Sequence, residues 1–353
     1  MKNDLEKKKS VENYLRKILK KDNLSKGINN NIIKEIGLLT FSKYLFIIII
    51  EKIYNRIINI ELIGKLIYLI YLLRNKHREP FIKPNILMKF YKFRTAFYPC
   101  KKYHNFKKNF SIEEDSDFKY AVIKNDRIAF PKHWNKIEIR NNFNSILNEF
   151  SHDKGNTSPH QYISLDKIER DWIVYDIGTA EGYQAKIWSQ KVKYVVIFEP
   201  DYDFYSTLLK TFENEIKCNK VKILNIGVSN KKKEIRFRNQ TYKFDSLDNI
   251  ILEFNLPKPN YLKVDIEGEE MNFLKGSKTT LESKCVDLIE ITTYHRPNDY
   301  IEIPNYLNNY RGNGHFTDGV MLFNRNGVII PKMGDFYSPI IRKCLYKYKF
   351  DSK

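Results

Sequence analysis

Cysteine is scarce in this chain of 353 residues, and no C-x-x-C pair occurs. The four cysteines lie far apart, and none has a histidine beside it at metal-finger spacing. These absences argue against a zinc ribbon and against a disulfide framework. We therefore expect Cys100, Cys218, Cys285 and Cys344 to be free, buried thiols in a reducing compartment.

Long hydrophobic runs are also absent. The two most apolar stretches, YLFIIII (44–50) and LIYLIYLL (66–73), are separated by charged residues. Both are much shorter than the roughly 18 to 20 apolar residues of a membrane-spanning helix. The first ten residues, MKNDLEKKKS, are too polar for a signal peptide. The sequence thus predicts a cytoplasmic protein without a membrane span.

Acidic residues are few in the first third of the chain. Residues 1–110 contain 25 Lys and Arg against 8 Asp and Glu, whereas residues 111–353 contain 36 against 34. Apolar residues recur among the lysines at helical spacing, which predicts a basic helical N-terminal extension. It could be a helical cap on the core, contact the anionic inner face of a membrane, or contact RNA. Its aromatic residues are mixed into aliphatic runs and look buried, so nucleic acid is the least favoured partner.

The remaining sequence divides into a short segment, 111–170, and a regular one, 171–353. In the first, a strand pair over 120–123 and 127–130 and a helix from about 136 to 150 are expected. In the second, near-continuous apolar strands alternate with helices. We expect strands at 171–178, 193–200, 221–227, 234–238, 261–268 and 286–292, and helices at 182–191, 202–216 and 269–282. This alternation predicts a doubly wound, mostly parallel Rossmann-like α/β domain.

Ligands of such sheets bind beyond the carboxyl ends of the strands. The first strand runs into Asp176, Gly178, Glu181 and Gly182, with glycines that suit a sharp turn and a tight helix start. The glycine spacing is not that of the dinucleotide fingerprint, and a carboxylate two residues before Gly178 would repel a phosphate. Glu199 ends the second strand, where a carboxylate can bind a ribose diol.

A ligand with a cationic amino-acid end and a ribose, but no phosphate, is S-adenosylmethionine. The residues alone leave an alternative open. Asp176 could simply cap the helix, while the two glycines form a turn.

Three sequence motifs resemble those of a known protein family. The segment LKVDIEGEEMNFLKG (262–276) resembles the signature of FkbM-type methyltransferases. SPHQY (158–162) and TYHRPND (293–299) are similar to strings found in a bacterial branch of that family. The likeness runs from about residue 120 to 343 and includes GHFTDGVMLF (314–323) as a closing hairpin, but it does not extend to residues 1–110.

The resemblance implies a class I methyltransferase fold and methyl transfer from S-adenosylmethionine, usually to a hydroxyl of a small metabolite, glycan or lipid-linked sugar. It also implies that the cofactor contacts Asp176, Gly178, Glu181, Gly182, Glu199, Val228 and Ser229. The adenine would lie near Val228 and Ser229.

An alcohol must lose a proton when it is methylated, so a base within hydrogen-bond reach is expected. His295 is the favoured base because histidine titrates nearest neutral pH, followed by Asp265 and His160. An unassisted transfer also remains open. Asp265 and Glu267 could instead hold loop backbone, and either histidine could be structural.

Three further residues are candidates for binding the acceptor: Glu267, Arg296 and Asp299. Arg296 and Asp299 could equally form a structural ion pair with His295. Asp265, Glu267 and a histidine have the ligand types that suit Mg²⁺ or Mn²⁺. Because no tight ligand spacing supports this, no metal site is predicted.

The favoured function is O-methylation of a surface glycan or lipid-linked saccharide, with the basic extension at the membrane. An RNA methyltransferase and a non-catalytic binding protein that retains the fold are the alternatives. The intact set of Asp176, Gly178, Gly182 and Glu199 argues against the last of these.

Overall fold

The structure is a computed structural model that describes residues 110–149, 158–237, 240–318, 321–323 and 340–351. The chain divides into two compact units, one of residues 1–95 and 322–341 and one of residues 96–321 and 342–353. The predicted basic extension, with its three interpretations, lies outside the described residues. The site and its supporting fold belong to the second unit.

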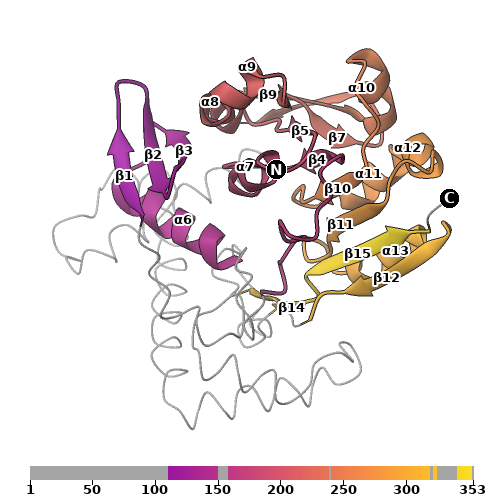
Figure 1. Ribbon diagram of the computed structural model, residues 1–353. Helices are drawn as coiled ribbons and strands as arrows, with labels where there is room; N and C mark the ends of the chain where they lie inside the picture. Colours follow the sequence, from indigo (N-terminus) through magenta and orange to yellow (C-terminus); the bar gives the residue numbers. More distant parts are fainter. Residues whose placement is uncertain (1–109, 150–157, 238–239, 319–320, 324–339, 352–353) are drawn as a thin grey trace, which may run out of the picture. The chain divides into compact units, whose positions relative to one another are not determined.

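Seven strands form the central sheet of this unit (Figure 1). In spatial order they are β12 (Gly312–Phe316), β15 (Leu345–Phe350), β11 (Leu288–Thr292), β10 (Tyr261–Val264), β4 (Ile173–Ile177), β5 (Tyr194–Phe198) and β6 (Val221–Leu224). The five strands from β11 to β6 are parallel, and β15 is antiparallel to both of its neighbours. Strand order reverses between β4 and β10, which confirms the predicted doubly wound sheet and places its switch point there.

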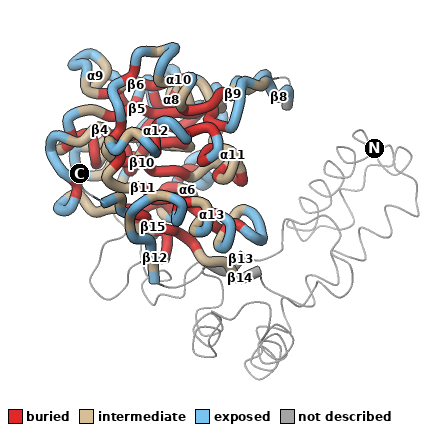
Figure 2. The backbone as a smooth tube through the Cα atoms, turned by 90° about the vertical axis from the view of Figure 1, so that its right-hand side faces the viewer, coloured by how far each residue is buried: buried red, intermediate tan, exposed pale blue. Residues whose placement is uncertain are grey.

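The two faces of this sheet are covered differently. One apolar face, including Tyr175 and Ile291, joins a single core cluster with residues of the helices α10 (Leu247–Glu253), α11 (Glu270–Lys275), α12 (Lys278–Glu282) and α13 (Asp299–Leu307). The other face carries α7 (Tyr183–Ser189), α8 (Tyr202–Thr211) and the neighbouring α9 (Glu213–Lys217). Figure 2 shows the central strands in the colour of buried residues.

A row of charged residues crosses the second face. The register aligns Asp176 of β4, Lys263 of β10, Glu290 of β11, Lys347 of β15 and His315 of β12 as successive neighbours. Side chains at paired positions point to the same face of a sheet. Acidic and basic side chains therefore alternate from strand to strand along this row, from β4 to β15. This row lies on the same face as the segment around residues 161–163, which hydrogen-bonds to Glu290 and Lys347.

Two predicted helices are each divided. The helix expected over 202–216 becomes α8 and α9, and the one expected over 269–282 becomes α11 and α12. The second break falls at Gly276, where a Cβ atom would lie 2.1 Å from the carbonyl oxygen of Ser229. Close backbone approach from β7 therefore interrupts the helix there.

The predicted strand pair before the main domain is confirmed and extended. It comprises β2 (Phe118–Ile123) and β3 (Asp126–Pro131), with a third strand, β1 (Ser111–Glu114), added at its edge. The helix α6 (Lys136–Glu149) follows, and Asn135 and Glu138 form a reciprocal cap at its start. This segment packs on the main sheet domain, because the Ala129 N–H donates to Thr211 Oγ1 of α8 at 2.9 Å.

The strand expected over 221–227 ends at Leu224, and Gly227 begins a different sheet. That sheet contains β7 (Gly227–Ser229), β9 (Gln240–Ser246) and β8 (Lys233–Phe237), in this order. A Cβ atom on Gly227 would lie 2.3 Å from the ring of Phe244, so the ring of β9 covers the backbone where the chain changes sheets.

The expected closing hairpin over 314–323 is wrong. β12 pairs with β15 at the edge of the large sheet, while β13 (Met321–Phe323) pairs with β14 (Ile340–Arg342). The segment therefore supplies strands to two separate sheets instead of pairing with itself.

The described cysteines are free, as expected, but only one is buried. Cys344 is buried, Cys285 is half-buried and Cys218 is exposed. Within the ranges that the structure describes, no helix has the length and apolar character needed to cross a bilayer. The apolar runs at 44–50 and 66–73 lie outside those ranges.

The glycine in the turn after β4 has less room for a side chain than a second glycine with positive φ. Gly178 has φ 79°, and a Cβ atom there would lie 1.8 Å from the Asp265 carbonyl oxygen. Gly268 also has positive φ, 100°, but its added Cβ would meet only the Arg296 side chain at 3.2 Å. We expect Gly178→Ala to lower the free energy of unfolding by at least about 2 kcal/mol more than Gly268→Ala, measured by urea denaturation. Equal losses would contradict the contact.

Candidate active site

The switch point brings two loops together. The turn after β4 begins with Gly178, and its close backbone contact with Asp265 places it against the loop that follows β10. Gly182 also has φ 79°, and its added Cβ would lie 2.5 Å from Leu208 of α8. Gly178 is thus required by the close backbone approach of the β10 loop, whereas Gly182 is favoured by its positive φ and its added Cβ would displace only the end of a leucine side chain.

Asp176 lies beneath this turn and is almost fully buried. The Lys263 ammonium is 2.9 Å from Asp176 Oδ1 and also donates a hydrogen bond to the Gly178 carbonyl. Burial alone would lower the pKa of Lys263, but Asp176 and Asp265 raise it, so the lysine is charged. Asp176 already has a cationic partner that the sequence interpretation did not include. Its contact with a ligand ammonium stays a prediction.

Glu199 directly follows β5 next to the same turn and is 6% exposed. Its Oε2 accepts the Ala180 N–H at 3.0 Å, and its Oε1 accepts the Asp201 N–H at 2.9 Å. Burial raises the pKa of Glu199 to about 7. Two backbone bonds fix the carboxylate, and each oxygen retains a lone pair that a ribose hydroxyl could use.

The other proposed cofactor residues lie in different surroundings. Burial raises the pKa of Glu181, which follows the β4 turn. Val228 and Ser229 are buried in β7, and Ser229 Oγ donates to Glu269 Oε2 at 2.6 Å. The Ser229 hydroxyl thus faces α11, and adenine contact by this pair remains a prediction.

Asp265 is the centre of a hydrogen-bonded group after β10. Its carboxylate accepts from the Tyr162 hydroxyl at 3.1 Å and the Tyr294 hydroxyl at 3.2 Å, and it lies 3.1 Å from His160 Nε2. Burial would raise the pKa of Asp265, but His160 and the nearby cations hold it well below its usual range. A carboxylate so stabilised is a weak base, so its geometry suits positioning better than proton removal.

His160 is 2% exposed, and both of its ring nitrogens are occupied. Nδ1 is 2.8 Å from Glu149 Oε1, and Nε2 is 3.1 Å from Asp265 Oδ2. Burial would lower the pKa of His160, but Glu149 and Asp265 raise it to about 9. At neutral pH it is a buried cation between two carboxylates, which does not suit the role of base.

His295 has the geometry of a general base. Its Nδ1 is 2.7 Å from Glu270 Oε1, while Nε2 lies 3.7 Å from Asp265 Oδ1 and 3.6 Å from Glu267 Oε2. With Nδ1–H donated to Glu270, the Nε2 lone pair is directed toward Asp265 and Glu267, which together with His295 form the rim of the candidate site. Burial lowers the pKa of His295, but the Glu270 carboxylate outweighs it and raises the pKa above its ordinary value.

Glu270 is a candidate functional residue that sequence reasoning missed. It is fully buried at the start of α11, and its Oε1 also accepts from the Ile266 N–H and the Thr292 hydroxyl, each at 3.1 Å. The signal was the second glutamate of GEE (268–270), which falls in the first turn of α11. A buried carboxylate bonded to a histidine orients the ring and stabilises its protonated form.

The three predicted acceptor residues do not form one cluster. Glu267, with φ 55°, has a 91% exposed side chain. Asp299 is buried and accepts the backbone N–H of Arg296 at 2.9 Å, so the expected side-chain pair is instead a side-chain-to-backbone bond. The Arg296 guanidinium lies 3.8 Å from Glu269 Oε1. Only Glu267 and Arg296 therefore have the exposure that acceptor binding requires.

The rim also contains a possible metal-ligand set. One ligand atom each from Asp265, Glu270 and His295 lie within 4.8 Å of one another. The set differs from the one considered from sequence by having Glu270 in place of Glu267. The Glu270–His295 hydrogen bond would have to rearrange for both residues to bind one ion, so we derive no chemistry from a metal.

The strand order, with the antiparallel β15 between β11 and β12, defines a Rossmann-like α/β fold of the class I methyltransferase type. Residues 240–313 match the methyltransferase FkbM domain. The resemblance predicted from the motifs is thereby confirmed, and the chain carries an FkbM-type segment. The match includes Asp265, Glu270 and His295 but not the turn after β4.

A curated relative, the hexuronic acid methyltransferase AglP of Haloferax volcanii, is 30% identical over 155 residues. The aligned part is 39% of this chain and 64% of the relative, so the chain spans less than two thirds of that protein.

Two solved structures are also similar to the chain. Methyltransferase FkbM from Methylobacillus flagellatus KT is 18% identical and has a TM-score of 0.40, with 52% of this chain and 44% of that one covered. The C-terminal domain of precorrin-6Y C5,15-methyltransferase from Rhodobacter capsulatus is 11% identical and has a TM-score of 0.35, with 57% and 93% covered.

The His160 network predicts a pH-dependent contribution to stability. Because its pKa rises from 6.5 to about 9 on folding, the stabilisation is complete below about pH 6.5 and is lost as pH rises through about 9. We expect His160→Gln to reduce the free energy of unfolding by about 2 to 3 kcal/mol at pH 6 and by clearly less at pH 9.5, measured by urea denaturation. A gap that does not change with pH would refute this assignment.

Proposed function

We propose that this protein is an S-adenosylmethionine-dependent O-methyltransferase that acts on a saccharide hydroxyl. The observation that carries the proposal is the backbone contact between Gly178 and Asp265. It joins the loop that would hold the methyl donor to the rim that carries the His295–Glu270 pair. A donor site and a candidate base are thus adjacent, as direct transfer requires.

The residues near the β4 turn fit the proposed cofactor. Glu199 presents a backbone-fixed carboxylate that suits a ribose diol. Three acids, Asp176, Glu181 and Asp265, lie near the turn, and Lys263 and His160 offset the charges of Asp176 and Asp265. Carboxylates at this position favour a ligand ammonium over a diphosphate. When bound, S-adenosylmethionine supplies an activated methyl group.

The chain's own residues then have to orient the acceptor and remove its proton. His295 Nε2 would take the hydroxyl proton as the oxygen–carbon bond forms and the methyl carbon–sulfur bond of the donor breaks, with S-adenosylhomocysteine as the leaving group. The buried Glu270 would stabilise the resulting imidazolium. Tyr162 and Tyr294 hold Asp265 in place beside this nitrogen. Glu267 and Arg296, both exposed at the rim, are placed to bind other hydroxyls of the acceptor.

The relative named as a hexuronic acid methyltransferase supports a saccharide acceptor. The aligned segment, at 30% identity, covers only 64% of that relative. We therefore propose only the chemical class of the acceptor, a saccharide. Residues 1–110 contain 25 basic and 8 acidic residues. This surplus of positive charge supports binding of the protein to an anionic membrane surface, where lipid-linked saccharides are found.

Calorimetry with S-adenosylmethionine tests the cofactor assignment. We expect binding by the full chain and an affinity at least about tenfold weaker in Glu199→Gln, because one charge-assisted contact to the ribose is lost. Glu282→Gln, which changes an exposed acid on α12, is the matched control and should leave the affinity unchanged. Absence of binding at millimolar cofactor would end the methyltransferase proposal.

Methyl transfer to uronic acids from tritiated S-adenosylmethionine tests the base. His295→Asn should lower kcat by about 10² to 10⁴ with cofactor affinity retained. Glu270→Gln should lower kcat less and move the acidic limb of the pH profile to lower pH, because Glu270 raises the pKa of His295. Full activity in His295→Asn would assign the base elsewhere.

A further inference from the structure

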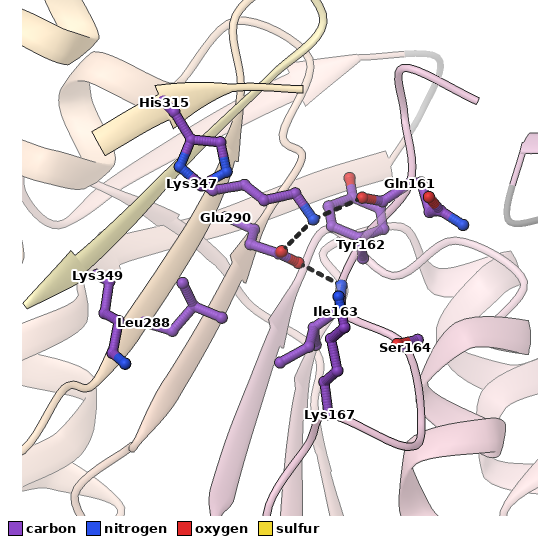
Figure 3. A pocket seen from close by; sticks show the side chains of 10 residues that line it. All are labelled: Gln161, Tyr162, Ile163, Ser164, Lys167, Leu288, Glu290, His315, Lys347 and Lys349. Atoms are coloured by element: carbon purple, nitrogen blue, oxygen red, sulfur yellow. Dashed lines mark hydrogen bonds and ion pairs between the residues drawn. The ribbon is translucent and has the colours of Figure 1, made fainter. Parts of the chain in front are cut away.

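A concavity lies on the sheet face that carries the charged row. It has a volume of about 330 Å³, within the range of small-ligand sites. Figure 3 shows its walls, with Leu288 and Glu290 of β11 and two lysines of β15 on one side and the segment 161–167 on the other. His315 of β12 lies at one end.

The charges inside this cavity are unbalanced. Glu290 is 1% exposed and is satisfied by the Ile163 N–H at 2.7 Å, the Tyr261 hydroxyl at 2.5 Å and the Lys347 ammonium at 2.5 Å. Lys347 also donates to the Gln161 carbonyl at 2.8 Å. The only acid lining this described cavity is therefore already paired with one of its lysines.

Two cations remain at the cavity. Lys167 and Lys349 line it with exposed side chains, and no hydrogen bond or ion pair joins their ammonium groups to another described residue. The exposed imidazole of His315 adds a third donor. Cations facing one concavity repel each other and concentrate anions there.

The cavity is linked to the candidate active site through one side chain. The ring of Tyr162 lines the cavity, and its hydroxyl donates to Asp265 at the rim. Tyr162 is 1% exposed, so the two places are joined through a packed side chain and not through an open path. We infer that the cavity binds a small anion, a carboxylate or a phosphate.

Anion binding is measured without a methyl donor or acceptor, so its test is independent of the proposed function. Isothermal calorimetry in 50 mM NaCl would use inorganic phosphate, glucuronate and neutral glucose as probes. The proteins would be the full wild-type chain, the double variant Lys167→Ala/Lys349→Ala, and Lys258→Ala as an exposed-lysine control. Melting temperatures would show that all three are folded.

We expect at least one anion to bind and glucose to bind at least tenfold more weakly. The double variant should lose at least tenfold in anion affinity, while Lys258→Ala stays within twofold of wild type. Binding of phosphate alone identifies a phosphate site, and binding of glucuronate alone or of both anions identifies a site that accepts carboxylate. No anion binding, or equal affinity in wild type and the double variant, overturns the inference.

Cofactor affinity measured on the same proteins separates the two proposals. Lysine-dependent anion binding without S-adenosylmethionine binding would reject the enzyme but keep the anion site. Cofactor binding without lysine-dependent anion binding would keep the enzyme proposal and reject the anion site.

Discussion

The buried pair of Asp176 and Lys263 is the interaction on which the site depends. The two residues are register partners on adjacent parallel strands, and both are nearly inaccessible to water. Losing one partner of such a pair typically costs about 3 to 5 kcal/mol, since the other charge is left buried. The same ammonium also binds the Gly178 carbonyl, so the ion pair fixes the direction in which the chain leaves β4.

From that fixed turn the rest of the rim follows. Gly178 can approach the Asp265 carbonyl only because it lacks a Cβ atom, and Asp265 in turn binds two tyrosine hydroxyls and His160. Both ring nitrogens of His160 lie against carboxylates, so it is a structural cation. In His295, Nε2 remains directed toward the rim, 3.6 to 3.7 Å from the nearest carboxylates. Two histidines near one carboxylate thus differ in role because their second ring nitrogens have different partners.

The sequence predicted the parallel sheet well because buried strands such as 193–200 are apolar throughout and alternate with helices. It also located Asp265 and His295, because both follow strands. It missed Lys263 as a partner of Asp176, Glu270 as a partner of His295, and the Glu290–Lys347 pair, because each depends on strand register or on the start of a helix. The 314–323 hairpin failed for a related reason: local turn residues do not reveal that a distant strand, β15, is the better partner.

A crystal structure of the full chain with S-adenosylhomocysteine would show whether the turn after β4 holds the methyl donor. We expect the ribose hydroxyls on Glu199 and the sulfur at the rim beside His295, with the Asp176–Lys263 pair intact beneath the turn. A ligand seated away from the carboxyl ends of β4 and β10, or a dinucleotide diphosphate held at the β4 turn in its place, would contradict it.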